Sequence, residues 1–473
     1  MLRMRYQTVA KPNRPIRLMF VTVLALAVLS LNIIPVPPAH AQTSGVSYYV
    51  DCNGNDGAGG TSPASAWQSL TKANRAPLQP GDRLLFKRGC AWSGTLKAAW
   101  HGTAERRILI GAYGSGNLPK IHNGSTDLSD GYHNNVDIAG SYQTLEYLEA
   151  ALVNPPVDPG CRNNPVGFFI GFNFRNPDNL PNGGSYNVLR YSKASGHTAG
   201  VHFANNTHHD VVRANTVTDN LAMSQLTPLS VNASDDLGAW GMLVKGSKHE
   251  IAFNYLANNR ALCTYDTVEH GNAIELYEAR DTVIHHNTSV NDRVFSELGG
   301  SPALRASNNS YLYNLVISSL PDTRFVVVRG AENPFGPTAN TKVHNNTVYY
   351  TGARSQALVC HAGCSTSILT AQNNILWAEE KAIFADGRII ESNNLYWSSN
   401  GQPFVQLLAS SMSATSKIAN PGFADAAGQN YRLTSASPAI DAGVVCRYRK
   451  DLAGTALPQG SAYDIGAFEY AGG

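Results

Sequence analysis

Charged residues are scarce in this chain of 473 residues: they make up 15% of it, and the formal net charge is +2. So small a charge provides no basic surface for a phosphate backbone, and a nucleic-acid partner is not expected. Long stretches of Ala, Glu, Lys and Leu are also missing, which argues against a helical fold. The apolar stretches are short, rich in Val, Ile, Phe and Tyr, and bounded by Asn, Gly, Asp and Pro, and they predict a mainly β protein.

Long apolar runs are missing too, except for one that extends from Leu18 to Ile34. It follows Arg14 and Arg17 and precedes the small-residue site Ala39-His40-Ala41. This order is typical of a secretory signal peptide over residues 1–41, and it predicts a secreted chain with no membrane partner after cleavage. An uncleaved membrane anchor is the alternative, because the run is nearly as long as a spanning helix.

Cysteine is sparse, with seven residues. This is too few for a disulfide scaffold in an exported chain of this size, but local bridges are expected. Cys360 and Cys364 can close one loop, and a bridge between Cys52 and Cys90 would tie down the N-terminal region. His361 between the first two does not complete a zinc site, because a second ligand pair is missing.

Asparagine, in contrast, recurs at the ends of β-rich stretches in the C-terminal half, roughly 20 to 40 residues apart. The residues concerned are Asn215, Asn254, Asn287, Asn314, Asn346, Asn374 and Asn394. The spacing is near the length of one coil of a parallel β-solenoid with loop insertions. An asparagine at the same corner of each coil can bond its amide to the asparagines above and below it. The repeat therefore predicts stacked parallel coils.

Segments at both ends of the repeat carry a family resemblance. The N-terminal ones are Tyr48-Tyr49-Val50-Asp51, Pro80-Gly81-Asp82-Arg83-Leu84-Leu85-Phe86 and Ile108-Leu109-Ile110-Gly111, and the C-terminal ones are Asn420-Pro421-Gly422-Phe423, Ser437-Pro438-Ala439-Ile440-Asp441 and Asp464-Ile465-Gly466-Ala467-Phe468. With the asparagine repeat they resemble secreted right-handed parallel β-helix proteins related to pectate lyases. The resemblance covers nearly all of the chain after residue 41 and implies an all-β, right-handed parallel β-helix of the carbohydrate-active type.

A solenoid exposes unpaired strand edges at both ends and needs capping segments there. We expect an N-terminal cap with the first coils over residues 42–130, the main coils over 131–400 and a closing segment over 401–473. No Pro- or Ser-rich linker separates an independent module, and we expect a monomer.

Two glutamates are expected to lie side by side on the outside of the coils. Because residues alternate along a strand, placing Ile274 and Leu276 in the core turns Glu275 outward, and the same phase turns Glu297 outward on the next coil. Neighbouring strands lie about 4.8 Å apart, so the two carboxyl groups would adjoin, and one of them is expected to have a raised pKa. This spacing is that of retaining glycosidases. The alternative is two surface glutamates bridged to Arg293 or Arg329.

Titratable and aromatic residues gather around this pair, where two loops, residues 224–239 and 259–271, lengthen the coils. Long insertions on one side of a scaffold usually build the walls of a cleft. Asp266, Glu269 and His270 are the further catalytic candidates. The substrate-binding candidates are His202, Asp235, Asp236, Trp240, Lys245, Tyr265, Tyr277, Arg293 and Arg329.

The sequence thus predicts a secreted enzyme that degrades a polysaccharide, with a glycoside hydrolase as the leading interpretation. A lyase that cleaves uronic-acid polymers by β-elimination is the alternative, since Val244-Lys245-Gly246-Ser247 resembles the lysine-bearing coil of alginate and chondroitin lyases of β-helix type. That family has an arginine one coil later, where this chain has Glu275 or Glu278. A non-catalytic glycan-binding solenoid is the third interpretation.

Metal is not expected in the catalytic site. Residues 51–57 place oxygen ligands at alternating positions, as a calcium loop does, but lack the terminal glutamate, so we expect a structural turn with calcium as the alternative. The doublets His208-His209 and His285-His286 lie in or beside strands, where adjacent side chains face opposite ways, so neither is expected to chelate a metal. No other cofactor is expected.

Overall fold

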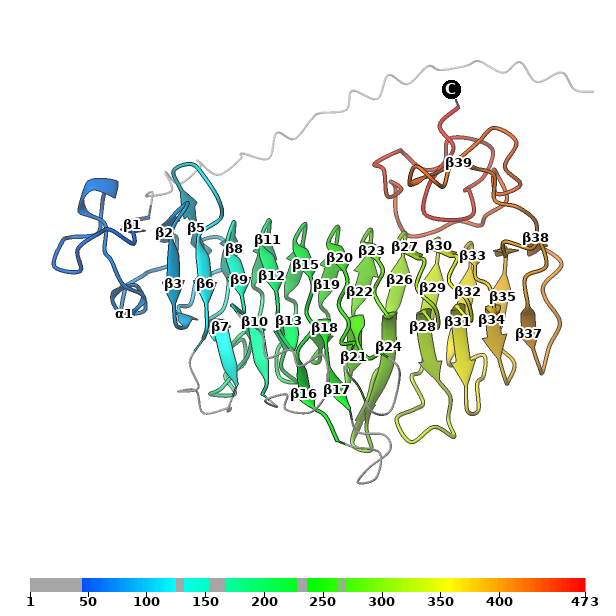
Figure 1. Cartoon of the computed structure of the whole chain (residues 1–473), viewed down its shortest axis with the longest axis horizontal. Coiled ribbons are helices and arrows are strands. Elements are labelled where there is room, and N and C mark those ends of the chain that lie inside the picture. The colour runs from blue at the N-terminus through cyan, green and yellow to red at the C-terminus, as the bar shows by residue number, and fades with distance from the viewer. Residues whose placement is uncertain are drawn as a thin grey trace, which may run out of the picture. The chain divides into compact units, whose positions relative to one another are not determined.

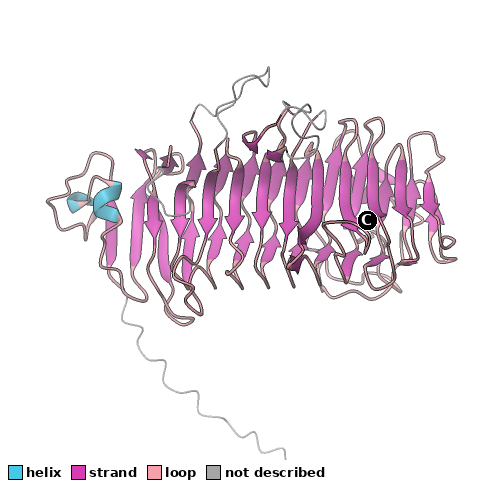
Figure 2. Ribbon diagram, turned by 90° about the horizontal axis from the view of Figure 1, so that it is seen from below, coloured by secondary structure: helices cyan, strands magenta, loops and turns pink. Residues whose placement is uncertain are grey.

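The chain forms a right-handed parallel β-helix, as predicted. The computed structural model describes residues 45–124, 132–153, 167–227, 236–262, 264 and 269–472. Its coils stack into three sheets of 12 strands, here called sheets A, B and C, and each coil passes through them in that order (Figures 1 and 2). Within the described residues, no helix is long and apolar enough to cross a bilayer.

The strands are short because each coil turns sharply between sheets. Sheet A consists of β1 (Ser47–Val50), β2 (Arg83–Lys87), β5 (Ile108–Tyr113), β8 (Gln143–Glu146), β11 (Val188–Arg190), β14 (Val211–Arg213), β19 (Glu250–Ala252), β22 (Val283–His285), β26 (Ser310–Leu312), β29 (Thr341–His344), β32 (Leu369–Gln372) and β35 (Ile390–Ser392). Sheet B consists of β3 (Ala91–Ser93), β6 (Lys120–His122), β9 (Glu149–Ala151), β12 (Lys193–Ser195), β15 (Thr216–Thr218), β20 (Tyr255–Ala257), β23 (Thr288–Val290), β27 (Leu315–Ser318), β30 (Thr347–Tyr350), β33 (Ile375–Trp377), β36 (Leu395–Trp397) and β38 (Lys417–Ile418).

Sheet C has longer strands and carries the candidate site. It consists of β4 (Leu96–Ala98), β7 (His133–Ile138), β10 (Phe169–Phe174), β13 (Ala199–Phe203), β18 (Trp240–Val244), β21 (Asn272–Tyr277), β24 (Val294–Ser301), β25 (Leu304–Arg305), β28 (Arg324–Arg329), β31 (Gln356–His361), β34 (Lys381–Ala385) and β37 (Val405–Leu407). Outside the stack lie the hairpins β16 (Met223–Gln225) with β17 (Leu237–Gly238) and β39 (Phe423–Asp425) with β40 (Asn430–Leu433). The helical segments are η1 (Pro63–Ser65) and α1 (Leu70–Ala73).

The predicted asparagine ladder is confirmed at the corner between sheets A and B. From Asn215 to Asn394, each asparagine donates from its backbone N–H and its side-chain amide to the Oδ1 of the next, at 2.9–3.1 Å. The residue before each of them is left-handed, with φ between 53° and 57°. The ladder binds buried groups that these tight corners would otherwise leave unpaired.

The inside of the stack is one continuous apolar core. Inward residues of successive strands superpose in register, as Val212, Ile251 and Ile284 do in sheet A. All three are fully buried in the same cluster, which runs from Val50 to Tyr396. Because neighbouring coils share the core, the outward residues are held in fixed register, and this positions the candidate site.

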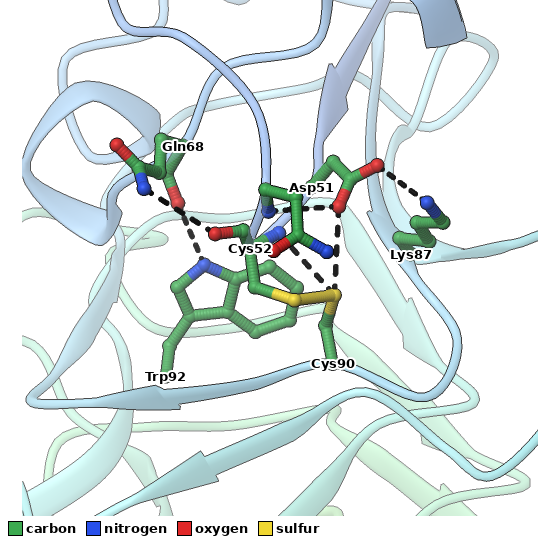
Figure 3. Close-up of a disulfide and its surroundings, with 7 residues drawn as sticks. Asp51, Cys52, Gln68, Lys87, Cys90 and Trp92 are labelled. Carbon is green, nitrogen blue, oxygen red and sulfur yellow. Dashed lines mark hydrogen bonds and ion pairs between the residues drawn. A yellow bond between two sulfur atoms is a disulfide. The ribbon is translucent and has the colours of Figure 1, made fainter.

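A disulfide joins the N-terminal cap to the first coils (Figure 3). Cys52 and Cys90 are bonded, and beside them the Nε1 of Trp92 donates to the backbone carbonyl of Gln68 at 2.8 Å. The second predicted bridge, Cys360–Cys364, is also present.

The acidic turn at residues 51–57 forms an ion pair and hydrogen bonds with neighbouring segments of the chain. Asp51 pairs with Lys87 at 2.6 Å (Figure 3), and Asp56 accepts from the backbone N–H and the hydroxyl of Ser69, which caps α1. Within the described residues, the one group of three potential metal ligands is Asp51, Cys52 and Cys90, and the two cysteines are bonded to each other. These contacts stabilise the turn.

The C-terminal segment packs against the A–B corner of the later coils (Figure 1). The left-handed residue Asn373 exchanges two hydrogen bonds with the backbone of Val444, at 2.8 and 3.0 Å, and Asn393 donates to the carbonyl of Ala442. A small core that includes Ile375 and Ile465 lies beneath them. These asparagines hold the segment, while those of the ladder hold the coils.

Candidate active site

Chemically active side chains form one outward column along sheet C. Residues paired across successive strands give the order Lys97, Asp137, Asn173, His202, Leu243, Glu275, Glu297, Val327, Val359, Phe384 and Gln406. The first four are polar, the two glutamates lie in the middle, and the next three are apolar. The titratable side chains of the column therefore lie on its first seven strands.

Glu275 and Glu297 face each other in register on β21 and β24, as predicted. Ile274 and Leu276 are fully buried in the core, so the side chain of Glu275 between them points outward. Glu275 is nevertheless only 8% exposed, because neighbouring outward side chains cover it. The structure thus places a buried carboxyl directly beside a second one.

The environment of Glu275 favours its protonated form. Burial removes water from the carboxyl, the charge of Glu297 opposes a second negative charge, and together they raise its pKa to about 8. The nearby Arg329 and a hydrogen bond from the side-chain amide of Asn272 act in the opposite direction but are weaker. The expected raised pKa of one member of the pair is therefore found at Glu275.

Glu297 has a cationic partner. The guanidinium of Arg329 donates from Nη2 to its Oε1 at 2.5 Å and from Nη1 to the carbonyl of Leu298 at 2.9 Å. The side chains of Arg329 and Glu297 are 15% and 27% exposed. An ion pair in this partly buried position stabilises the carboxylate of Glu297. The pair thus combines a buried carboxyl whose pKa is raised with a carboxyl bound to Arg329, so the bridge to Arg329 named in the alternative interpretation is present alongside the pairing.

An aromatic cluster adjoins the glutamates on the preceding strands. Trp240 packs with Leu243, Phe168 and Tyr277, and it is 6% exposed. Phe168 from the previous coils lies against Trp240 with ring centroids 5.9 Å apart, so Trp240 is packed within this cluster. Tyr277 is half-buried, with the Nζ of Lys245 lying 5.2 Å from the centre of its ring.

Glu269, His270 and Arg293 lie just before the strands that carry the two glutamates. Glu269 pairs with Arg260 at 2.6 Å, and the Nδ1 of His270 is 3.2 Å from the carbonyl oxygen of Gly238. Arg293 is half-buried, and burial with the nearby charge of Arg324 lowers its pKa. Of the two arginines named in the alternative interpretation, Arg329 pairs with a glutamate, and among the described residues Arg293 forms no ion pair with Glu275 or Glu297.

Of the remaining predicted residues, Asp236 is buried and accepts from the backbone N–H of Thr227 at 3.1 Å. Asp235, Tyr265 and Asp266 lie outside the described residues. His202 and Lys245 line a groove of about 340 Å³ on the strands before the glutamates.

Sequence reasoning missed several residues around the column. They are Asn272, which bonds to Glu275; Asn173 and Arg175, which line the groove; and Phe335, which is 46% exposed and has its ring centre 5.1 Å from the guanidinium carbon of Arg329. Asn173, His202 and Leu243 occupy the positions on earlier strands that correspond to Glu275. Extending the strand alignment that located Glu275 to these strands would therefore have located Asn173. No pattern marked Phe335, which lies in a loop.

The geometry expected of the histidine doublets is wrong. His209 and His286 are left-handed, with φ of 57° and 55°, so each turns back toward the preceding histidine. The two Nδ1 atoms are 2.9 Å apart in His208-His209 and 2.8 Å apart in His285-His286. The alternation rule fails here because each doublet ends at a corner.

Two solved structures similar to this chain have the parallel β-helix fold. Pectate lyase Pel9A aligns with a TM-score of 0.55 and 15% identity, covering 89% of this chain and 96% of that one. A GH136 lacto-N-biosidase from Eubacterium ramulus aligns with a TM-score of 0.52 and 16% identity, covering 77% of this chain and 66% of that one. No protein-family model and no curated protein sequence matches the chain. At these identities the similarity establishes the fold alone.

Proposed function

We propose that this chain is a secreted glycoside hydrolase that cleaves a polysaccharide between Glu275 and Glu297. The observation that carries the proposal is the pairing of a buried carboxyl, whose pKa is raised to about 8, with a carboxylate bound to Arg329. Two carboxyl groups whose environments separate their protonation states are the arrangement that glycoside hydrolysis requires.

In the proposed reaction Glu275 is the acid. Its proton passes to the glycosidic oxygen as the bond to the anomeric carbon breaks, and Glu297 attacks that carbon to form a glycosyl-enzyme ester. Glu275, now ionised, then removes a proton from water, which attacks the anomeric carbon and releases Glu297. The strand spacing of about 4.8 Å favours this two-step course, with retention of configuration, over direct attack by water between the carboxyl groups.

The positions of the neighbouring residues support these roles. The amide of Asn272 donates to Oε2 of Glu275, so the acidic proton is carried on Oε1. Arg329 anchors the other carboxylate. The solved glycoside hydrolase and pectate lyase with similar folds are compatible with action on a polysaccharide, and the bridges Cys52–Cys90 and Cys360–Cys364 are compatible with secretion.

β-Elimination on a uronic-acid polymer is the second candidate, favoured by the groove on the preceding strands. His202 lines it and could accept a proton, and Lys245 could neutralise a substrate carboxylate. A lyase releases unsaturated uronates that absorb ultraviolet light, whereas a hydrolase releases reducing ends without that absorbance.

The test is a polysaccharide panel with separate assays for reducing ends and unsaturated uronates. Glu275→Gln and Glu297→Gln should each lower kcat about 10²- to 10⁴-fold, and the first product should keep its anomeric configuration by NMR. Glu149→Gln is the control, since Glu149 pairs with Lys120 at 3.2 Å on sheet B. Full turnover by both site variants would reject the pair, and binding without turnover by the wild type would indicate a glycan-binding solenoid.

A further inference from the structure

The groove beside the glutamates is built around buried polar groups. It holds about 340 Å³, and its lining includes Asn173, Arg175, His202, Asn205 and Lys245. Asn173 is fully buried and His202 is 4% exposed, so the base of the groove is shielded from water. Buried polar groups at the bottom of a groove need partners for their hydrogen-bond donors and acceptors.

The groove is in line with the glutamate pair. His202 lies two strands before Glu275 in the outward column of sheet C, and Asn173 lies three strands before it. At a strand spacing of about 4.8 Å, these steps amount to about 10 and 14 Å. A pyranose unit spans roughly one such step, so a polymer lying across the strands would reach the groove a few sugars from the cleaved bond.

The base of the groove has a hydrogen-bond donor without a partner. His202 donates from Nδ1 to Oδ1 of Asn173 at 2.7 Å, which leaves the amide nitrogen of Asn173 buried and unbonded. Burial and the charge of Lys245 lower the pKa of His202 to about 3, so the ring is neutral and its Nε2 is an acceptor. A buried amide donor destabilises the protein unless an acceptor reaches it.

The groove also carries one uncompensated positive charge. Arg175 is bound to Asp137 through both of its carboxylate oxygens, which balances that guanidinium. Lys245 has no carboxylate partner among the described residues, and its Nζ lies over the ring of Tyr277. One cation beside an unpaired donor is the complement of one anionic group.

We propose that this groove is a subsite for an acidic sugar, whose anionic group lies between Lys245 and the amide of Asn173. The inference rests on the proposed function because it assumes that the polymer bound in the groove also reaches Glu275. It adds the substrate class: a polysaccharide that carries carboxylate or sulfate groups, with one of them a few sugars from the bond that is cleaved.

The test measures binding to the Glu297→Gln variant of the chain from residue 42, so that turnover does not interfere. The probes are oligosaccharides of galacturonate and of alginate, each with its carboxyl-reduced counterpart, and a sulfated galactan oligosaccharide with its desulfated counterpart. One acidic series should bind at least tenfold more tightly than its neutral counterpart by calorimetry. Adding Lys245→Gln should remove that preference, whereas adding Lys342→Gln, an exposed lysine of sheet A, should leave it unchanged.

A second variant keeps the test independent of Lys245. Adding Asn173→Asp places a negative charge at the base, and it should weaken the acidic probe at least as much as Lys245→Gln while changing the neutral one little; folding is checked by circular dichroism. The inference is overturned if no acidic probe binds, if acidic and neutral probes bind equally, or if Lys245→Gln keeps the preference. Full turnover by Glu275→Gln and Glu297→Gln would instead reject the hydrolase and leave the acidic subsite standing.

Discussion

The asparagine corner and the outward column of sheet C are two ladders built by the same stacking, and they differ in composition. At the corner the same residue occupies seven successive coils, and each amide bonds to the next. In the column the residue type changes at most strands, and between Lys97 and Gln406 the identical neighbours are the glutamate pair Glu275 and Glu297 and the valine pair Val327 and Val359. Both ladders have the same spacing along the stack.

The difference separates structural from functional repetition. A corner asparagine binds the backbone of its own and neighbouring coils, so any other residue leaves buried groups unpaired on both sides. The side chain of an outward residue is not needed for backbone hydrogen bonding, because the backbone of its strand is hydrogen-bonded to the neighbouring strands. The column is therefore free to hold a buried carboxyl, and such a feature is where function is expected.

The largest effect on stability is expected from breaking the uniform ladder. Asn346→Ala removes amide bonds to the carbonyls of Tyr311 and His344 and to Asn374, and it leaves the donors of Asn314 without an acceptor. We expect a loss of about 3 kcal/mol in the free energy of unfolding.

Guanidinium denaturation of Asn346→Ala measures this loss. Asn430→Ala is the control, because Asn430 is exposed and makes one weak bond, to the backbone N–H of Arg432 at 3.3 Å. Equal losses in the two variants would remove the distinction between ladder and surface asparagines.

The next effect concerns the buried carboxyl of the column. The folded-state pKa of Glu275, about 8, lies above its ordinary value of 4.5, so the folded chain holds a proton that the unfolded chain releases between these values. The stability contributed by Glu275 is therefore complete below pH 4.5 and is lost as the pH rises to about 8.

Glu275→Gln has no proton to lose and should be more stable than the wild type at pH 9, with the difference vanishing near pH 4.5. Thermal unfolding of both chains over this pH range measures it. Parallel curves would show that Glu275 is ionised in the folded state, and it could not then be the acid.

A smaller effect is expected from the cation that binds the second glutamate of the column. Arg329→Gln removes the charge that binds Glu297 and should lower kcat/KM about tenfold, equivalent to about 1.4 kcal/mol. Arg354→Gln is the matched control, since Arg354 pairs with Asp322 at 2.6 Å but has a side chain that is 65% exposed. Steady-state kinetics on the same polysaccharide compares them, and equal rates would make the Arg329 ion pair a surface contact only.

Sequence reasoning could predict whatever depends on the stacking itself. The asparagines of the corner must superpose, so a repeat ending on Asn254 or Asn287 located the coils, and alternation between Ile274 and Leu276 located the glutamate. It could not predict features that depend on where a coil bends or what covers it. Trp240 is hidden by Phe168 from another coil, and the second histidine of each doublet is left-handed because a corner begins there.

The smallest expected effect is that of Asn272, which bonds to Glu275 from the start of the same strand. Its amide donor favours the ionised carboxyl, so Asn272→Ala should raise the pKa of Glu275 further, by less than one unit, and move the alkaline limb of kcat/KM upward. A residue that only supports the fold would lower the rate at every pH and leave the limb in place. Asn272→Ser, which keeps a donor, should restore the wild-type limb. A downward shift of the limb in Asn272→Ala would mean that the amide stabilises the protonated form, contrary to the role given to Oε2.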